Sequence, residues 1–323
     1  MTGGAHDMTY LIRHVTSFSY QPAVGESVME VRLQPRTDMR QRCLSSNLYV
    51  TPQANVMVYR DFYGNAVHHF DVPGKHQVIE VVSEATVEML PRIDPDGVKQ
   101  SSWEDLDELV SQGDYWEMLL PSQYARITPP LQELREELNL ERRGNPLFLL
   151  KDLNSAIYEY FAYVPNTTRV DSPIDEALRS RQGVCQDFTH IMIALVRQLR
   201  IPCRYVSGYL YHGDHHHDRS TAGASHAWAE AYLGEPGWVE FDPTNNLLGC
   251  ERHIRVAVGR DYADVPPTRG VHRGEAESEL RVSVTVSALD APRAEDLGAA
   301  MVIHSKRAPL PTLSADTQFQ NQQ

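Results

Sequence analysis

The chain has 323 residues, of which 41% are hydrophobic, so it can form one large domain or two smaller ones with a substantial buried core. Its formal net charge of −13 disfavours nucleic acid or an anionic membrane surface as a general partner. No apolar stretch approaches the roughly 20 residues that a membrane-spanning helix needs. We therefore expect neither a nucleic-acid partner nor a membrane partner.

The N-terminal part is predicted to be a β-rich domain over residues 8–98. Runs of strand-forming residues occur at 55–62, 66–70 and 78–89, with turn residues such as Tyr63-Gly64-Asn65 between them. Short strands with frequent turn signals are typical of a sandwich or a barrel-like module.

The pattern then changes to a helical one. We predict a helical connector over 99–150 and a second folded domain over 151–290. Across the boundary between the two, Leu149, Leu153 and Ile157 recur at every fourth residue and so share one helix face. Alternating apolar residues at 280–288 predict a late strand, and the polar tail over 308–323 is predicted to be disordered.

Three short segments in this second domain carry side chains suited to one chemistry. They contain Cys185 (Gly-Val-Cys-Gln-Asp-Phe), His226 (Ser-His-Ala-Trp) and Asp242 (Gly-Trp-Val-Glu-Phe-Asp-Pro-Thr). Apolar residues at helical spacing follow Cys185, which places the cysteine in the first turn of a helix, where the helix dipole favours a thiolate. His226 and Asp242 fall in strand-like segments that two adjacent antiparallel strands would bring side by side. The carboxylate would then fix the tautomer of the imidazole.

The order of these motifs resembles the transglutaminase-like superfamily, and more narrowly the bacterial transglutaminase-like proteins described as cysteine proteases. Further segments carry the likeness, at 163–168 (Tyr-Val-Pro-Asn-Thr-Thr), 201–210 (Ile-Pro-Cys-Arg-Tyr-Val-Ser-Gly-Tyr-Leu) and 257–264 (Ala-Val-Gly-Arg-Asp-Tyr-Ala-Asp). The family often has alanine where this chain has Cys203, and a small residue is kept. The resemblance covers most of the chain, to about Leu289. It implies an α+β fold, with a papain-like catalytic core whose nucleophile helix packs on an antiparallel sheet, preceded by a β-rich N-terminal domain.

The predicted function is cysteine-dependent hydrolysis of an amide or peptide bond through a Cys185–His226–Asp242 triad and an acyl-enzyme thioester. The expected substrate is a peptide or protein, an isopeptide or a small amide. Transfer of the acyl group to an amine remains open, because water and an amine attack the same thioester. A binding module that only uses the fold is the alternative outside enzymes, and an intact set of three residues argues against it.

Several residues near these three in sequence are candidates for supporting roles. Trp228 and Trp238 are expected to pack around the site, and Gln186 and Asp187 to support the helix start. The backbone amide of Cys185 is the expected oxyanion donor. Tyr163 and Asn166 are weak candidates for a second donor.

The cysteines and histidines outside this set predict no metal and no cofactor. Cys43, Cys203 and Cys250 form no Cys-x-x-Cys pair or zinc spacing, and we expect structural roles for them. The histidine-rich segment 212–218 is predicted to be a solvated hairpin loop, and 94–97 a turn without the ligands of a calcium loop. The first residues lack the basic start and apolar segment of a secretory signal, so we expect reduced thiols in the cytoplasm.

Overall fold

The computed structural model describes residues 8–92, 94–99, 101–213, 217–289 and 317–321. The chain divides into two compact units. One unit is discontinuous in sequence and combines residues 1–91 with 266–323, and the other is the continuous segment 92–265. Within the described residues, no helix combines the length and apolar character needed to cross a membrane.

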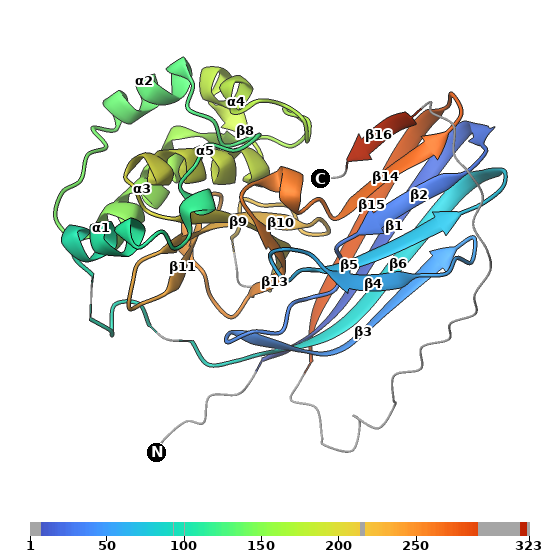
Figure 1. Ribbon diagram of the computed structural model, residues 1–323, viewed down its shortest axis with the longest axis horizontal. Coiled ribbons are helices and arrows are strands. Elements are labelled where there is room, and N and C mark those ends of the chain that lie inside the picture. Colours follow the sequence, from blue (N-terminus) through green and yellow to red (C-terminus); the bar gives the residue numbers. More distant parts are fainter. Residues whose placement is uncertain (1–7, 93, 100, 214–216, 290–316, 322–323) are drawn as a thin grey trace. The chain divides into compact units, whose positions relative to one another are not determined.

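The discontinuous unit contains two antiparallel sheets (Figure 1). One sheet has the order β15 (Glu277–Leu289), β1 (Thr9–Val24), β6 (His76–Met89) and β3 (Gln41–Thr51). The other has the order β16 (Thr317–Asn321), β14 (Thr268–Arg273), β2 (Ser27–Val31), β5 (Ala66–Val72) and β4 (Met57–Arg60). Alternate residues from both sheets, such as Phe18 of β1 and Phe70 of β5, form one buried cluster. The two sheets therefore pack face to face as a sandwich, which agrees with the β-rich N-terminal region expected from the sequence.

The continuous unit is built on a five-stranded antiparallel sheet (Figure 1). Its order is β12 (Leu247–Leu248), β11 (Trp238–Asp242), β10 (His226–Tyr232), β9 (Cys203–Leu210) and β13 (His253–Gly259). Its helices are α1 (Trp103–Ser111), α2 (Pro129–Glu137), α3 (Pro146–Tyr160), α4 (Ile174–Ser180) and α5 (Cys185–Gln198). Two 3-10 turns, η1 (Trp116–Met118) and η2 (Tyr262–Asp264), and a short parallel pair, β7 (Ala162–Tyr163) with β8 (Gln182–Gly183), complete it.

Helix α5 is the central helix of this unit. Every residue from Gln186 to Arg197 is buried, because α5 packs on β9 and β10 while α2, α3 and α4 pack against it. One apolar cluster joins these helices to the sheet. A helix enclosed in this way holds its first residue, Cys185, in a fixed position.

The compact units differ from the predicted domain boundaries in two places. Residues 266–289 were predicted to belong to the second domain, but β14 pairs with β2 and β15 pairs with β1, so they complete the sandwich. The predicted connector over 99–150 is part of the continuous unit, since Leu106 of α1 and Leu131 of α2 lie in the same core cluster as α5. In the tail predicted to be disordered, 308–316 and 322–323 lie outside the described residues, whereas 317–321 form β16 on the edge of β14.

Candidate active site

Cys185 is the first residue of α5, as the sequence predicted, and its side chain is partly exposed. The carboxylate of Asp187 accepts hydrogen bonds from the backbone amide of Val184 at 2.9 Å and from Thr168 Oγ1 at 2.6 Å. The side-chain amide of Gln186 donates a hydrogen bond from Nε2 to the backbone carbonyl of Val170 at 2.9 Å. These contacts fix the start of the helix, which is the end where backbone amides and the helix dipole favour negative charge.

His226 and Asp242 meet at one edge of the sheet. His226 begins β10 and Asp242 ends β11, and because the two strands pair antiparallel, these ends lie together. The ring nitrogen Nε2 of His226 lies 2.8 Å from Oδ2 of Asp242, and the two side chains are 3% and 0% exposed. The expected pairing of imidazole and carboxylate is therefore present, and both side chains are buried.

Asp242 is held by more than His226. Its Oδ1 accepts the backbone amides of Thr244 at 3.0 Å and Asn245 at 3.2 Å, and its Oδ2 accepts Asn245 Nδ2 at 2.8 Å. Asn245 Oδ1 in turn accepts the backbone amide of Ser220 at 3.1 Å. Burial acts to raise the pKa of Asp242, but the charges and hydrogen bonds of the surrounding histidines outweigh it and hold that pKa well below its usual range. The carboxylate is therefore ionised at neutral pH.

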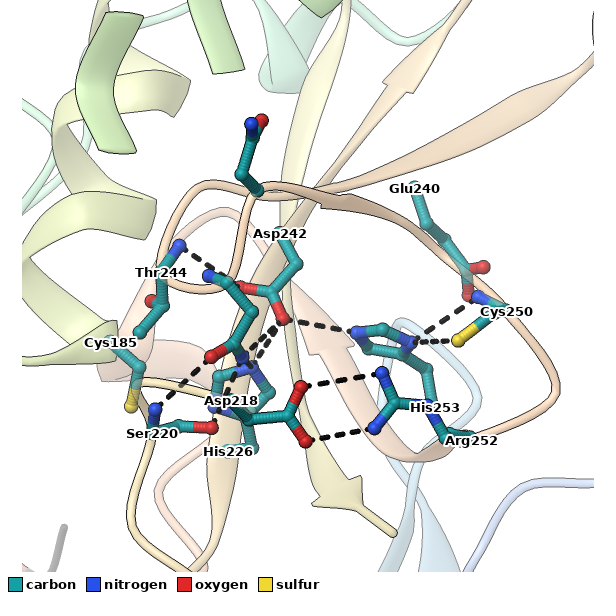
Figure 2. A network of polar contacts seen from close by, with 12 residues as sticks. Cys185, Asp218, Ser220, His226, Glu240, Asp242, Thr244, Cys250, Arg252 and His253 are labelled. Carbon is teal, nitrogen blue, oxygen red and sulfur yellow. Dashed lines mark hydrogen bonds and ion pairs between the residues drawn. The ribbon is translucent and has the colours of Figure 1, made fainter. Parts of the chain in front are cut away.

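His226 is charged at neutral pH. Burial acts to lower its pKa, but the charge of Asp242, its hydrogen bond and the neighbouring Cys185 thiol together raise that pKa to about 10. Nδ1, the other ring nitrogen, is buried and has no hydrogen-bond partner among the described residues. Figure 2 shows Cys185 on the side of His226 away from His253. An imidazolium beside a helix-start cysteine is the arrangement that stabilises a thiolate nucleophile.

A second histidine, His253, also contacts the carboxylate. Its Nε2 lies 3.1 Å from Oδ2 of Asp242, and both side chains are fully buried (Figure 2). Sequence reasoning missed both His253 and the anchoring Asn245. The Cys-x-x-His spacing from Cys250 to His253 was a visible signal, but nothing in the linear sequence places β13 beside Asp242.

Trp228 packs against both histidines. Its ring stacks on His226 at a centroid distance of 6.0 Å and meets His253 edge-on at 5.0 Å. The tryptophan lies against Gly208 of β9, where a Cβ atom would come within 2.6 Å of the indole ring and 2.1 Å of the Ile254 carbonyl oxygen. Trp228 therefore has the packing role predicted for it. Trp238 packs elsewhere, under the guanidinium of Arg204 at 3.9 Å.

The two candidate oxyanion donors occupy different environments. The pKa of Tyr163 is raised, mainly by burial and to a smaller extent by the charge of Cys185. The Tyr163 hydroxyl lies 3.4 Å from Thr221 Oγ1. Tyr163 is thus in the electrostatic neighbourhood of the sulfur. Asn166 has a left-handed backbone with φ of 62° and an exposed side chain, and no described contact links it to the site.

Three other features were candidates for binding a metal ion or a ligand: a histidine–aspartate cluster, the loop 212–218 and a surface hollow. Single atoms of His226, Asp242 and His253 lie within 4.8 Å of one another, a spacing that a metal ion could bridge, yet these atoms are joined by the hydrogen bonds above. Of the loop 212–218, residues 214–216 lie outside the described part, and His212 pairs with Asp218 at 3.0 Å. A surface hollow of about 430 Å³ is lined by none of the three predicted catalytic residues; it lies among Gln123, Tyr124, Arg126, Thr128, Asp171, Pro173, Ile174 and Asp175.

The continuous unit is thus an α+β domain in which a cysteine at a helix start is combined with a histidine and an aspartate from an antiparallel sheet. A family model described as the transglutaminase-like superfamily matches residues 139–243, a range that includes all three residues. A second, described as the bacterial transglutaminase-like N-terminal region, matches residues 10–88. The chain belongs to the transglutaminase-like superfamily.

Several known proteins are similar to this chain. An uncharacterised protein of Mycobacterium leprae is 33% identical over 279 residues, which covers 85% of this chain and 97% of its own. A protein-glutamine gamma-glutamyltransferase of Pseudomonas aeruginosa is 29% identical over 162 residues, 45% of this chain and 23% of its own. The crystal structure of a "Putative Cysteine Protease" from Cytophaga hutchinsonii is similar in fold, with a TM-score of 0.69 at 22% identity over 90% of this chain and 93% of that one.

Proposed function

We propose that this protein is a cysteine-dependent hydrolase of amide or peptide bonds, with Cys185 as nucleophile, His226 as general acid and base, and Asp242 as the residue that orients His226. The observation that carries the proposal is the buried His226–Asp242 pair beside a cysteine at a helix start. The raised pKa of His226 supports it, because an imidazolium is the form needed to protonate a leaving amine.

The proposed reaction has two halves. The Cys185 thiolate attacks the carbonyl carbon, the backbone amide at the helix start stabilises the oxyanion, and the C–N bond breaks as His226 gives its proton to the leaving amine. The neutral imidazole then takes a proton from water, which attacks the thioester and releases the acid. The thiolate and the imidazolium are restored.

Acyl transfer to an amine is the second candidate. The similarity to a protein-glutamine gamma-glutamyltransferase favours it, since that name describes transfer of a glutamyl group. In this case a primary amine replaces water in the second half of the reaction, and the same three residues act.

The experiment is to trap the thioester. The protein is mixed with a library of short peptides that contain glutamine and asparagine, acid-quenched at short times, and analysed by intact mass and peptide mapping. We expect an acyl adduct on Cys185 that is absent from Cys185→Ala. A chase in buffer with and without a primary amine then distinguishes hydrolysis from transfer. An adduct of the same yield in Cys185→Ala would overturn the proposal.

A further inference from the structure

Asp242 joins two cysteine–histidine pairs. The ring of His253 bonds through Nε2 to Asp242 Oδ2, the same oxygen that His226 contacts, at 3.1 Å, while its Nδ1 lies 3.3 Å from the sulfur of Cys250. Figure 2 shows Cys185 and Cys250 on opposite sides of Asp242, each next to its own histidine. The second pair therefore repeats the order of groups proposed for the first.

The hydrogen bonds around His253 define its tautomer. The backbone amide of Cys250 donates to Nδ1 at 3.2 Å, so in this conformation Nδ1 is an acceptor. Nε2 must then carry the proton that is donated to Asp242. Nδ1, which also lies 3.3 Å from the Cys250 sulfur, can take the thiol proton in place of this amide contact, and the carboxylate behind the ring stabilises the resulting cation.

The charges near Cys250 favour the same outcome. Arg252, two residues after Cys250, forms an ion pair with Asp218 at 2.8 Å. Its guanidinium also interacts electrostatically with the Cys250 sulfur. The acidic groups on this segment's neighbours are Asp218, which pairs with Arg252, and Glu240, whose carboxylate lies against Gly249. Burial acts to raise the pKa of Cys250, but the bond to His253 and the charges of His253 and Arg252 outweigh it, so that pKa is lowered. Cys250 is also partly exposed.

We propose that Cys250 is a second nucleophilic thiol of this protein, a modification site for small soft electrophiles such as disulfides of low molecular mass, with His253 and Asp242 as its base and orienting carboxylate. In the exchange, the Cys250 sulfur attacks one sulfur of the disulfide, the S–S bond breaks and a mixed disulfide forms. The thiol proton passes through His253 to the released thiolate. Cys250 is oxidised and the released half of the reagent is reduced to its thiol.

The other two cysteines have no comparable setting. Burial raises the pKa of Cys43 to about 11 and that of Cys203 to about 12. Cys203 is fully buried. These residues are therefore internal controls, and labelling of Cys203 reports that a variant has lost its fold.

The test measures alkylation in full-length Cys185→Ser, so that it does not depend on the proposed hydrolase. Iodoacetamide is applied at pH 6.5, with glutathione as a free-thiol reference, and adducts at each cysteine are quantified by peptide mapping. We expect Cys250 to react faster than the reference thiol. In Cys185→Ser with His253→Gln, we expect its rate to fall by about tenfold or more, because the base is lost.

Two further variants test whether Cys250 reacts through His253 and Asp242 in particular. In the wild-type background, His226→Ala should slow Cys185 but not Cys250, whereas Asp242→Asn should slow both. Exposure to oxidised glutathione should add one mixed disulfide at Cys250 in Cys185→Ser. If Cys250 reacts no faster than the reference thiol, or equally fast with and without His253 while Cys203 stays unlabelled, the proposal is overturned.

Discussion

Asp242 accepts a hydrogen bond from His226 at 2.8 Å, and its side chain is completely excluded from solvent. In water such a carboxylate would contribute little, but in a buried site its charge acts on the imidazole with little screening. The raised pKa of His226 and the lowered pKa of Asp242 are two expressions of this one contact.

Replacement of Asp242 by asparagine removes that charge while the side-chain shape is kept. We expect turnover of a cleavable amide substrate to fall by about 10- to 1000-fold. This is less than the roughly four orders of magnitude known for serine proteases, because a thiolate–imidazolium pair is already charged before the reaction. Asp261→Asn is a matched control, since Asp261 is equally buried but caps η2, and folded Asp261→Asn should keep its turnover. Wild-type turnover in folded Asp242→Asn would remove Asp242 from the mechanism.

Loss of His226 should deactivate Cys185. A free thiol with a pKa of about 8.5 is only about 0.3% ionised at pH 6, so labelling at this pH reports stabilised thiolates. We expect brief iodoacetamide treatment at pH 6 to label Cys185 in the wild type. In His226→Ala the labelling should drop steeply at pH 6 and recover towards pH 9. Equal labelling of the two proteins at pH 6 would show that His226 does not activate the cysteine.

Stability should depend on pH through the same pair. The folded-state pKa of His226, about 10, lies above its ordinary value of 6.5, so its contribution to the free energy of unfolding is complete below pH 6.5 and is lost as the pH rises towards 10. For Asp242 the folded-state pKa lies below the ordinary 3.8, so its contribution is present above pH 3.8 and is lost on further acidification.

The measurement is urea unfolding of the wild type and His226→Gln between pH 5 and 10. The difference in the free energy of unfolding between the two proteins isolates the contribution of this pair. Other buried histidines, such as His14 and His190, whose pKa values burial lowers to about 4, contribute equally to both proteins. We expect the difference to shrink as the pH rises above 6.5. A difference that is constant across this range would contradict the assignment of a charged His226.

Gly208 should be essential to the packing of the site. Gly208→Ala would place a Cβ 2.6 Å from the Trp228 ring and 2.1 Å from the Ile254 carbonyl oxygen, so β9, β13 or the indole must move. Overpacking of this kind typically costs about 1–3 kcal/mol, and we expect a lower free energy of unfolding together with reduced labelling of Cys185 at pH 6. Gly97→Ala, with its nearest neighbour at 3.5 Å, is the control and should change neither quantity.

The parts of this protein that its sequence determines are those with a local cause. The apolar spacing after Cys185 dictates an amphipathic helix that begins there, and Asp187 closes that start with a contact three residues away. The strand segments that carry His226 and Asp242 are equally short-range features, and their antiparallel pairing follows from the short connection between them.

The domain boundary near residue 266 and the position of His253 depend on pairing between strands that are distant in sequence. The strands at 268–273 and 277–289 look in sequence like a continuation of the second domain, but their partners are β2 and β1, more than 200 residues away. Likewise, His253 faces Asp242 only because β13 pairs with β9 in a particular register, and a slip by one residue would turn its side chain to the other face of the sheet. The Cys-x-x-His spacing of Cys250 and His253 is visible in the sequence, but the contact of His253 with Asp242 depends on the packed sheet and is shown only by the tertiary structure.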